Sequence, residues 1–198
     1  MSNKVGRSHD NDFEFVSRCQ KGDGEAFGVL VERHQKKMFN VAFRMTGDYE
    51  EAAEVVQEAF FSAFRAIRKF RGEATFATWI TGIVLNHSKN RLKKMKAISR
   101  YEPVSLDEVF EGPRFDPPSG EISVEAQLEK KAIEGAVQEC INSLDEEFRE
   151  VLILRDIQEF SYEEISAALT IPDGTVKSRI NRGRDALRKL LKRKLGDW

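Results

Sequence analysis

The stretch Ser161–Leu191, SYEEISAALTIPDGTVKSRINRGRDALRKLL, predicts two helices joined by a short turn. Ser161 and Glu164 have the spacing of a capping box, in which each side chain satisfies a free backbone N–H of the other residue, so the first helix is expected to begin at Ser161. Pro172 prevents one continuous helix, and Asp173 can cap the second. A short helix, a turn and a longer basic helix together predict a helix-turn-helix.

The second helix of this motif has two different faces when it is projected at about 100° per residue. Its apolar stripe is expected to pack on the preceding helices, and its outer face is polar and basic. In helix-turn-helix proteins, residues near the start of this helix reach base edges in the major groove, and basic residues farther along contact phosphates. The expected DNA contacts are Lys177, Ser178, Asn181, Arg182 and Arg188. An ordinary solvated helix face is the alternative.

The composition argues against several classes of protein. The 198 residues are 40% hydrophobic and 33% charged, and no segment has the roughly 18 apolar residues of a membrane span. Residues 1–15 contain no apolar run of the kind found in signal peptides, so we expect a soluble protein of the cytoplasm. The cysteines and histidines are isolated from one another: Cys19, Cys140, His9, His34 and His87. No nucleophile set, metal-ligand set or phosphate loop is found, so neither an enzyme, a metal nor a cofactor is expected.

Charge is segregated along the chain. Six basic residues and no acid lie between Lys89 and Arg100, whereas residues 102–129 contain eight acids, one arginine and four of the five prolines. A segment rich in proline and acid, without helical periodicity, predicts an extended linker. We therefore expect two small domains, residues 1–100 and 129–198, joined by an acidic linker over residues 101–128.

Apolar residues recur at helical spacing on both sides of this linker. Before it, three helices are expected, the first ending near Gly47, the second near Arg71 and the third beginning near Thr75. After it, helices are expected over residues 124–144 and 146–158, ahead of the helix-turn-helix. No stretch alternates with a period of two for long enough to form a strand, so the predicted fold class is all-α.

The third expected helix carries a second candidate nucleic-acid surface. A narrow polar track lies opposite its apolar stripe: Thr78, Gly82, Asn86, Lys89 and Lys93. Gly82 would let another backbone approach closely, Asn86 could read a base edge, and the lysines could hold phosphates. The loop before the helix adds Arg71, Phe76 and Trp79, a combination of basic and aromatic side chains that suits an unstacked base. The alternative is that Phe76 and Trp79 are core residues.

The outer face of the second expected helix is acidic but contains an aromatic residue. Phe61 lies about 120 to 140° from the apolar stripe of that helix. Its neighbours on the outer face are Glu51, Glu54, Glu58 and Arg65. An acidic rim around an apolar side chain suits a protein partner with basic residues. Single exposed apolar residues are also common on protein surfaces, which leaves a solvated face open.

Two long blocks of the chain resemble one known family. They are EEAAEVVQEAFFSAFRAIRKFRGEATFATWITGIVLN at residues 50–86 and SLDEEFREVLILRDIQEFSYEEISAALTIPDGTVKSRINRGRDALRKLL at residues 143–191. Their order and spacing resemble those of bacterial RNA polymerase sigma factors of the extracytoplasmic-function (ECF) class in the sigma-70 family, over about Phe27–Leu191. The resemblance implies a transcription initiation factor whose N-terminal domain opens and reads the minus-10 element and whose C-terminal domain reads the minus-35 element.

The resemblance also implies partners and the residues that contact them. Core RNA polymerase would be bound through its β′ clamp helices and its β flap, and the face that docks on the clamp helices is Glu54, Gln57, Glu58 and Phe61. The loop Arg71 to Phe76 and Asn86 match the pocket for a flipped base. The implied minus-10 contacts are Arg71, Phe76, Asn86, Lys89, Asn90 and Lys93. The linker resembles a segment that threads into the polymerase, and an anti-sigma factor is a further implied partner beside promoter DNA.

A helix-turn-helix regulator that binds an operator as a dimer is the alternative function, because the C-terminal block alone resembles such regulators too. Dimers of that kind hold two half-sites about one helical turn apart. A sigma factor differs because it co-purifies with core polymerase and binds duplex promoter DNA poorly by itself. Lys177 and Asn181 stand where relatives vary widely, so the resemblance does not name the promoter sequence.

Overall fold

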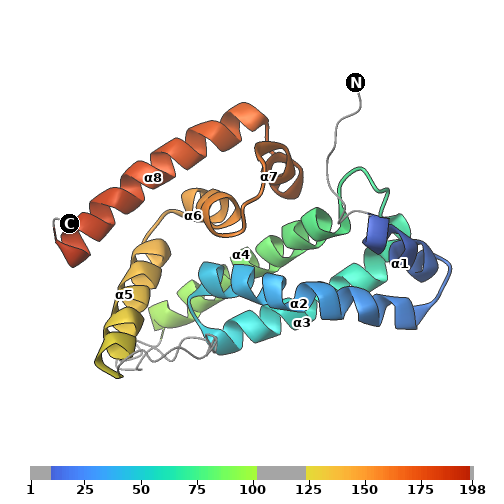
Figure 1. Cartoon of the computed structure of the whole chain (residues 1–198), viewed down its shortest axis with the longest axis horizontal. Helices are drawn as coiled ribbons and strands as arrows, with labels where there is room; N and C mark the ends of the chain where they lie inside the picture. The colour runs from blue at the N-terminus through green and yellow to red at the C-terminus, as the bar shows by residue number, and fades with distance from the viewer. Residues whose placement is uncertain (1–9, 102–123, 197–198) are drawn as a thin grey trace.

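The computed structural model describes residues 10–101 and 124–196, so most of the predicted linker lies outside the described residues. Within these ranges the chain is helical and contains no strand, which confirms the all-α prediction. The first elements are α1 (Asp10–Gln20), α2 (Gly24–Thr46), α3 (Tyr49–Ala66), the 3-10 turn η1 (Ile67–Lys69) and α4 (Phe76–Tyr101). The later elements are α5 (Val124–Asn142), α6 (Glu146–Leu152), the π-helical turn η2 (Ile153–Ile157), α7 (Tyr162–Leu169) and α8 (Asp173–Leu195) (Figure 1).

Helices α1 to α4 form an N-terminal domain, in which α2, α3 and α4 all pack against one another. The apolar positions at helical spacing become its core, and several are fully buried: Leu30, Met38, Val55, Ile80 and Leu85. The predicted end of α2 is found at Gly47, whose φ of 76° is a left-handed conformation that glycine adopts with little strain. Asp48 then caps α3, because its carboxylate accepts a hydrogen bond from the Glu51 N–H at 2.7 Å.

Helix α1 was not predicted from the sequence. Few of its side chains enter the core, so its apolar periodicity is weak: Val16 and Cys19 are the buried ones among those the structure describes. Polar contacts hold it instead. Gln20 donates hydrogen bonds to the carbonyl oxygens of Ile67 at 3.2 Å and Phe70 at 2.8 Å, which ties the end of α1 to η1 and the loop after it.

Helices α5 to α8 form a C-terminal domain that contains the predicted helix-turn-helix. The capping box at the start of α7 is confirmed: the Glu164 N–H donates to Ser161 Oγ at 3.1 Å, and the Ser161 N–H donates to Glu164 Oε2 at 2.8 Å. Helix α8 begins at Asp173, with Pro172 in the cap position and no capping side chain. The expectation that Asp173 caps this helix is therefore wrong, because Asp173 is already in its first turn.

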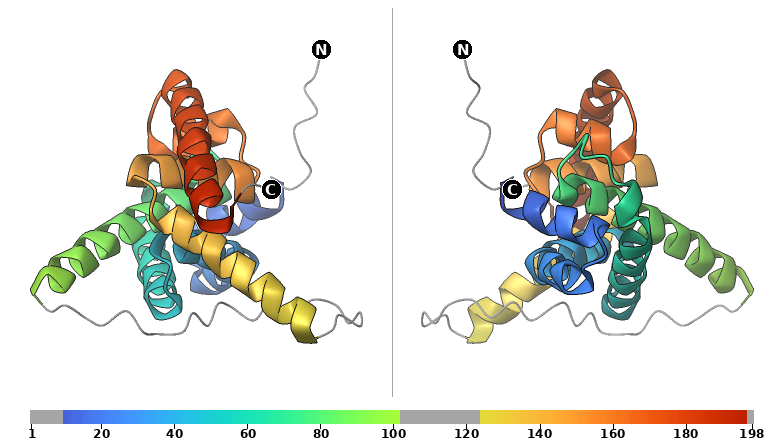
Figure 2. Two further views of the ribbon diagram at one scale, coloured as in Figure 1. Left: turned by 90° about the vertical axis from the view of Figure 1, so that its left-hand side faces the viewer. Right: turned by 90° about the vertical axis from the view of Figure 1, so that its right-hand side faces the viewer.

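The two domains pack against each other. Helix α7 contacts α4, while α5 and η2 contact α2. Helices α6 and α7 lie between α8 and the N-terminal domain, so α8 forms the outermost layer on that side (Figure 1). Away from this contact, the ends of α4 and α5 diverge (Figure 2). The predicted helix over residues 146–158 is divided, because the regular α-helix stops at Leu152 and η2 continues it.

Candidate functional site

Helix α8 keeps its predicted division into an inner and an outer face. Val176, Ile180 and Gly183 are buried against the rest of the C-terminal domain. All five residues predicted to contact DNA are exposed on the other side: Lys177, Ser178, Asn181, Arg182 and Arg188. A helix in the outermost layer with exposed carboxamide and basic side chains has the shape and chemistry that a DNA major groove accepts.

Other basic residues of α8 hold the domain together, a role that the sequence did not reveal. Arg179 NH2 lies 2.8 Å from Glu147 Oε2 of α6. Arg184 Nε donates to Asp156 Oδ2 of η2 at 3.1 Å. The excess of positive charge on α8 therefore serves two purposes, since some cations fix the helix on its own domain and others remain on its outer face.

The turn of the helix-turn-helix is stabilised by local hydrogen bonds. Thr170 ends α7 in a left-handed conformation with φ of 56°, which is uncommon for a residue other than glycine. Its N–H donates to the carbonyl oxygen of Ser166, and Ser166 Oγ donates to the carbonyl oxygen of Ile171 at 2.7 Å. These bonds offset the backbone strain and set the direction in which α8 leaves the turn.

The second predicted DNA surface is only partly open. Asn86, Asn90 and Lys93 are exposed on α4, and Arg71 is exposed in the loop before it. Thr75 caps α4, since its Oγ1 accepts a hydrogen bond from the Thr78 N–H at 3.0 Å. These exposed side chains flank the beginning and middle of one helix, so they can follow a single strand of nucleic acid.

Phe76 belongs to the core of the N-terminal domain. Only 3% of it is exposed, and its ring lies 6.4 Å from that of Phe27 and 5.8 Å from that of Trp79, measured between centroids. The assignment of Phe76 to the exposed wall of a base pocket is therefore corrected. A ring so enclosed cannot stack on a base. Phe76 is a core residue, which was the alternative interpretation of the sequence, and it supports the loop before α4.

The C-terminal domain covers another part of this surface. Gly82 of α4 faces α7, and a Cβ added to it would lie 2.7 Å from the carbonyl oxygen of Ala168. Close backbone approach at Gly82 was predicted, but the approaching backbone belongs to this chain. Lys89 Nζ lies 3.1 Å from Glu150 Oε2 of α6, so the predicted phosphate anchor already holds a carboxylate.

Glu150 joins the two predicted DNA surfaces. Its side chain is 6% exposed and lies between Lys89 of α4 and Arg179 of α8, whose NH1 is 3.4 Å from Glu150 Oε1. Burial raises the pKa of Glu150, and the charges of Lys89 and Arg179 only partly oppose that effect. A buried acid between two cations from different domains links the arrangement of the domains to the availability of Lys89.

Arg149 is the second buried polar residue at this junction. Its guanidinium donates to the carbonyl oxygen of Met45 in α2 at 2.7 Å, to that of Leu144 at 3.1 Å and to that of Asn142. Burial lowers the pKa of Arg149. Because these oxygens lie at the ends of α2 and α5, Arg149 satisfies acceptors that both helices leave unpaired. Nothing in the sequence periodicity distinguished this arginine from a surface residue.

The acidic face predicted to bind a protein is exposed on α3. Glu54 and Glu58 have 62% and 58% of their side chains accessible, and Gln57 is exposed beside them. Phe61 is 56% exposed, and the guanidinium of Arg65 lies 4.2 Å above the centre of its ring. A large apolar ring among accessible carboxylates remains on the surface, as the sequence predicted.

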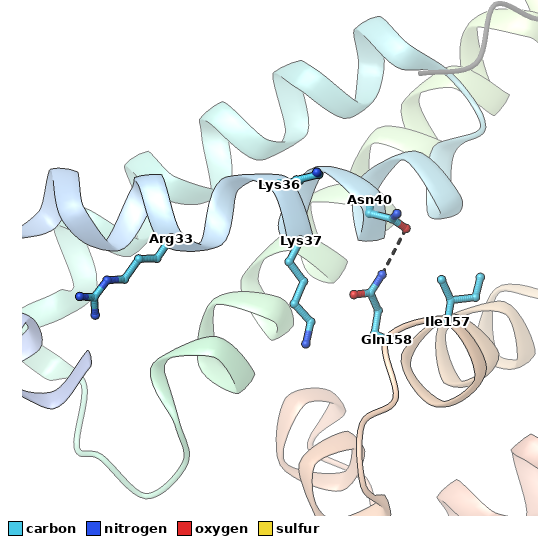
Figure 3. A pocket seen from close by; sticks show the side chains of 6 residues that line it. All are labelled: Arg33, Lys36, Lys37, Asn40, Ile157 and Gln158. Atoms are coloured by element: carbon cyan, nitrogen blue, oxygen red, sulfur yellow. Dashed lines mark hydrogen bonds between the residues drawn. The ribbon is translucent and has the colours of Figure 1, made fainter. Parts of the chain in front are cut away.

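A cavity of about 380 Å³ lies where η2 meets α2 (Figure 3). Its lining consists of Arg33, Lys36, Lys37, Asn40, Ile157 and Gln158. Gln158 Nε2 donates to Asn40 Oδ1 at 3.2 Å, and Lys37 Nζ lies 4.4 Å from the centre of the Phe160 ring. Arg33 pairs with Asp12 of α1 at 3.0 Å. Its lining comes from α2 of one domain and from Ile157 and Gln158 of the other, so the cavity is part of the contact between the domains.

Two negative findings apply to residues 10–101 and 124–196. No cluster of His, Cys, Asp and Glu in that part of the chain has an arrangement suited to a metal ion. None of the helices there is both long enough and apolar enough to span a membrane.

Comparison with known proteins identifies both domains. The family model described as Sigma-70 region 2 matches residues 30–98, and the model described as Sigma-70, region 4 matches residues 134–187. The chain is 37% identical to the RNA polymerase sigma-H factor of Pseudomonas aeruginosa over 187 residues, which are 93% of this chain and 95% of that protein. It is 40% identical to the ECF RNA polymerase sigma-E factor of Escherichia coli K12 over 177 residues, covering 87% and 90% of the two chains.

Solved structures share the fold. CnrH, solved in complex with the cytosolic domain of CnrY, superposes with a TM-score of 0.65 at 25% identity, covering 92% of this chain and 97% of that one. The sigma factor RpoE of Bartonella quintana, solved with the anti-sigma factor NepR, superposes with a TM-score of 0.64 at 22% identity, covering 84% and 96%. The latter likeness concerns the fold alone.

These matches define a sigma factor: the chain belongs to the sigma-70 family. Within that family it is of the ECF class, a transcription initiation factor that directs core RNA polymerase to promoters. The match of region 2 to the N-terminal half does not favour the operator-binding regulator, whose resemblance is confined to the C-terminal half. We refer below to the N-terminal and C-terminal domains as region 2 and region 4.

Proposed function

We propose that α8 of region 4 reads the minus-35 element through Lys177, Ser178, Asn181 and Arg182, with Arg188 on a phosphate. The observation that supports this most directly is the exposure of all five side chains on the outer face of a helix whose opposite face is buried. Arginine and lysine can donate to guanine O6 and N7, and asparagine can pair with adenine. Arg188 lies farther along the helix, where a phosphate is the nearer target.

We infer that region 2 holds the minus-10 element on α4 and the loop before it. Asn86 would read a flipped base, while Arg71, Asn90 and Lys93 would line the path of the strand. Phe76 supports this loop from the core. Lys89 can join them as a phosphate anchor only after it leaves Glu150, because its ammonium group already contacts that carboxylate at 3.1 Å. The contribution of Lys89 to binding of the minus-10 strand therefore requires its contact with Glu150 to open.

The face of α3 that carries Glu54, Gln57, Glu58 and Phe61 is our candidate for the β′ clamp helices of core polymerase. Its accessible carboxylates suit a basic partner, and Phe61 offers an apolar centre. We further propose that region 4 contacts the β flap.

Each proposed domain has its own binding role. Residues 1–100 would bind core polymerase and the minus-10 element, residues 129–198 would bind the minus-35 element, and residues 101–128 would connect them. The proposed place of action is the cytoplasm, with no catalytic activity of the chain itself. CnrH was solved with the cytosolic domain of CnrY, and the Bartonella RpoE was solved with NepR, which is named an anti-sigma factor. We propose that an anti-sigma factor also binds this protein.

The proposed function can be tested by transcription in a reconstituted system. The full chain and core polymerase are incubated with a promoter library randomised at the minus-35 and minus-10 elements, and transcripts are sequenced. We expect initiation from templates that share both elements. Initiation that depends on neither element, or that needs only a pair of half-sites, would contradict the assignment of the two DNA surfaces.

The role of Asn86 needs a separate arm of that assay. Asn86→Ala should slow open-complex formation on intact promoter DNA, measured by permanganate reactivity of unpaired thymines. Flipping a base costs a few kcal/mol in a duplex and less where the strands are already apart, so a template mismatched across the start region should restore part of the rate. If the variant opens the intact promoter as fast as wild type and keeps its base preference, Asn86 does not read the base.

A further inference from the structure

The acidic row on α3 is connected to α4 by an arginine that sequence reasoning did not single out. Glu51, Glu54 and Glu58 lie three and four residues apart, so they share one face of α3. Arg91 of α4 reaches all of them: its Nε lies 2.9 Å from Glu51 Oε2, and its NH2 contacts Glu54 and lies 3.8 Å from Glu58 Oε1. The planar guanidinium has five donors in a fixed fork, so one arginine can serve several carboxylates.

A histidine on the same face of α4 supplements this contact. His87 precedes Arg91 by one helical turn, and its Nδ1 lies 3.3 Å from Glu58 Oε2. Its other ring nitrogen, Nε2, lies 3.0 Å from Ser62 Oγ on α3. Glu58 is thus held from two directions by side chains of one neighbouring helix.

The exposures show which groups remain accessible. Only 13% of the Arg91 side chain is exposed, whereas Glu54 and Glu58 are more than half exposed. Arg91 therefore lies beneath the row and the carboxylates lie above it. An ionised carboxylate accepts at about four positions, so contact with Arg91 leaves acceptor positions of Glu54 and Glu58 open toward solvent.

We propose that Arg91 is a positioning residue that orders Glu54 and Glu58 for a basic protein partner, the β′ clamp helices of the proposed function, on which this inference rests. Without Arg91, three neighbouring carboxylates would repel one another and sample many rotamers. A partner would then have to order both side chains on binding, which weakens the complex. Arg91 carries out that ordering within the free chain.

Substitution of Arg91 distinguishes positioning from simple neutralisation of charge, because the two roles predict opposite signs. Loss of a neutralising cation makes the face more acidic and should strengthen its attraction for a basic partner. Loss of a positioning residue should weaken binding. For Arg91→Ala we expect an affinity for core polymerase lower on the order of tenfold, with a faster dissociation rate and an association rate that is unchanged or slightly raised. The affinity of Arg91→Lys should lie between those of wild type and Arg91→Ala, since an ammonium group keeps the charge but cannot contact three carboxylates at once.

The measurement is the binding of the full chain to immobilised core RNA polymerase, followed over time by biolayer interferometry at several salt concentrations. Lys94→Ala removes the same charge from the next turn of α4 and should bind as wild type does. Helical circular dichroism checks that each variant is folded. Should Arg91→Ala lose its helicity, Arg91→Lys and Arg91→Gln carry the test.

Glu58→Lys separates failure of this inference from failure of the proposed interface. If Glu58→Lys and Arg91→Ala both weaken binding while Lys94→Ala does not, the positioning role is supported. If Glu58→Lys weakens binding but folded Arg91 variants bind as tightly as wild type, or more tightly, the positioning role is wrong and the interface stands. If Glu58→Lys binds normally, α3 does not use this face and both proposals fail.

Discussion

The outer faces of α8 and α4 carry similar chemistry, yet the chain leaves the first open and covers part of the second. Lys177, Asn181 and Arg182 of α8 are exposed, whereas Lys89 of α4 contacts Glu150 and Gly82 lies against the backbone of α7. The difference arises because region 4 packs on region 2 through α5, η2 and α7 and keeps α8 on the outside (Figure 1). Residues with the same chemistry therefore differ in their availability to DNA, according to which side of the domain contact they occupy.

The largest expected effect comes from breaking the domain contact at its buried arginine. Arg149→Ala should lower the free energy of unfolding by about 3 kcal/mol, because the buried carbonyl oxygens of Met45 and Leu144 and the partly buried one of Asn142 lose their donor. Urea denaturation followed by circular dichroism measures this. The matched control is Arg182→Ala, an exposed arginine whose loss should change stability by at most about 0.5 kcal/mol. Equal stabilities of the two variants would mean that Arg149 does not support the covered face.

The next largest effect is on base discrimination by the exposed face of α8. Arg182→Ala should cost about 2 kcal/mol of discrimination at one base pair of the minus-35 element, because a side chain that contacts a base edge is removed. Selection from a library of upstream elements, with core polymerase present, reports the base preference at each position. Arg184→Ala is the control, since Arg184 is also on α8 but pairs with Asp156. An unchanged preference in the Arg182 variant would remove this residue from the readout.

A smaller effect on DNA affinity is expected at the covered face of α4, where Lys89 contacts Glu150. Glu150→Gln removes the charge that competes with phosphate for Lys89, so binding of a single-stranded minus-10 oligonucleotide should tighten by about 1 kcal/mol, or roughly fivefold. Fluorescence anisotropy with the free protein measures this affinity. Glu147→Gln provides the comparison, because Glu147 contacts Arg179 but not Lys89. Equal affinities in the two variants would show that Glu150 does not limit access to Lys89.

The pH dependence of stability gives the smallest effect and depends on the burial of the same carboxyl group. Because burial raises the pKa of Glu150 in the folded chain, the folded state keeps its proton where the unfolded chain has already released it. The stability contributed by Glu150 is thus fully present below the unfolded pKa and is lost as the pH rises through the folded pKa. Wild type should therefore lose stability relative to Glu150→Gln as the pH rises from about 4.3, the ordinary glutamate pKa, through the raised folded pKa of Glu150, as followed by urea denaturation. If the stability of wild type instead rose relative to that of Glu150→Gln as the pH increased, the proposed effect of Glu150 burial would be wrong.

Missed features of the fold share a physical cause. Helix α1 has only a few buried apolar side chains among those described. It is held by polar contacts such as the hydrogen bond from Gln20 to the carbonyl oxygen of Phe70, which no local sequence pattern predicts. Burial of Phe76 was left open because an aromatic residue at the start of a helix suits both a core and a base pocket. Contacts with rings from other parts of the chain, such as those of Phe27 and Trp79, show that Phe76 belongs to the core.

Local sequence patterns predicted most of the helices and the outer face of α8, but not α1 or the division of the helix at Leu152. Helical periodicity, the end of α2 at Gly47 and the capping box at Ser161 depend on residues that are close in sequence, so the sequence alone predicts them. The same holds for the exposure of Lys177 and Arg182, which follows from their place opposite a local apolar stripe. Phe61 among the acids of α3 was predictable for the same reason.

Contacts between distant parts of the chain set which functional side chains are engaged within it, and no local pattern predicted these contacts. Lys89 and Glu150 are 61 residues apart in sequence, and Arg149 reaches a carbonyl oxygen 104 residues away. Arg91 meets the acids of α3 from another helix in the same way. The spacing of residues along one helix fixes which face they share, but it carries no information about the opposing element. The partners of these buried charges depend on how the helices pack, because ion pairs form between side chains brought together in space.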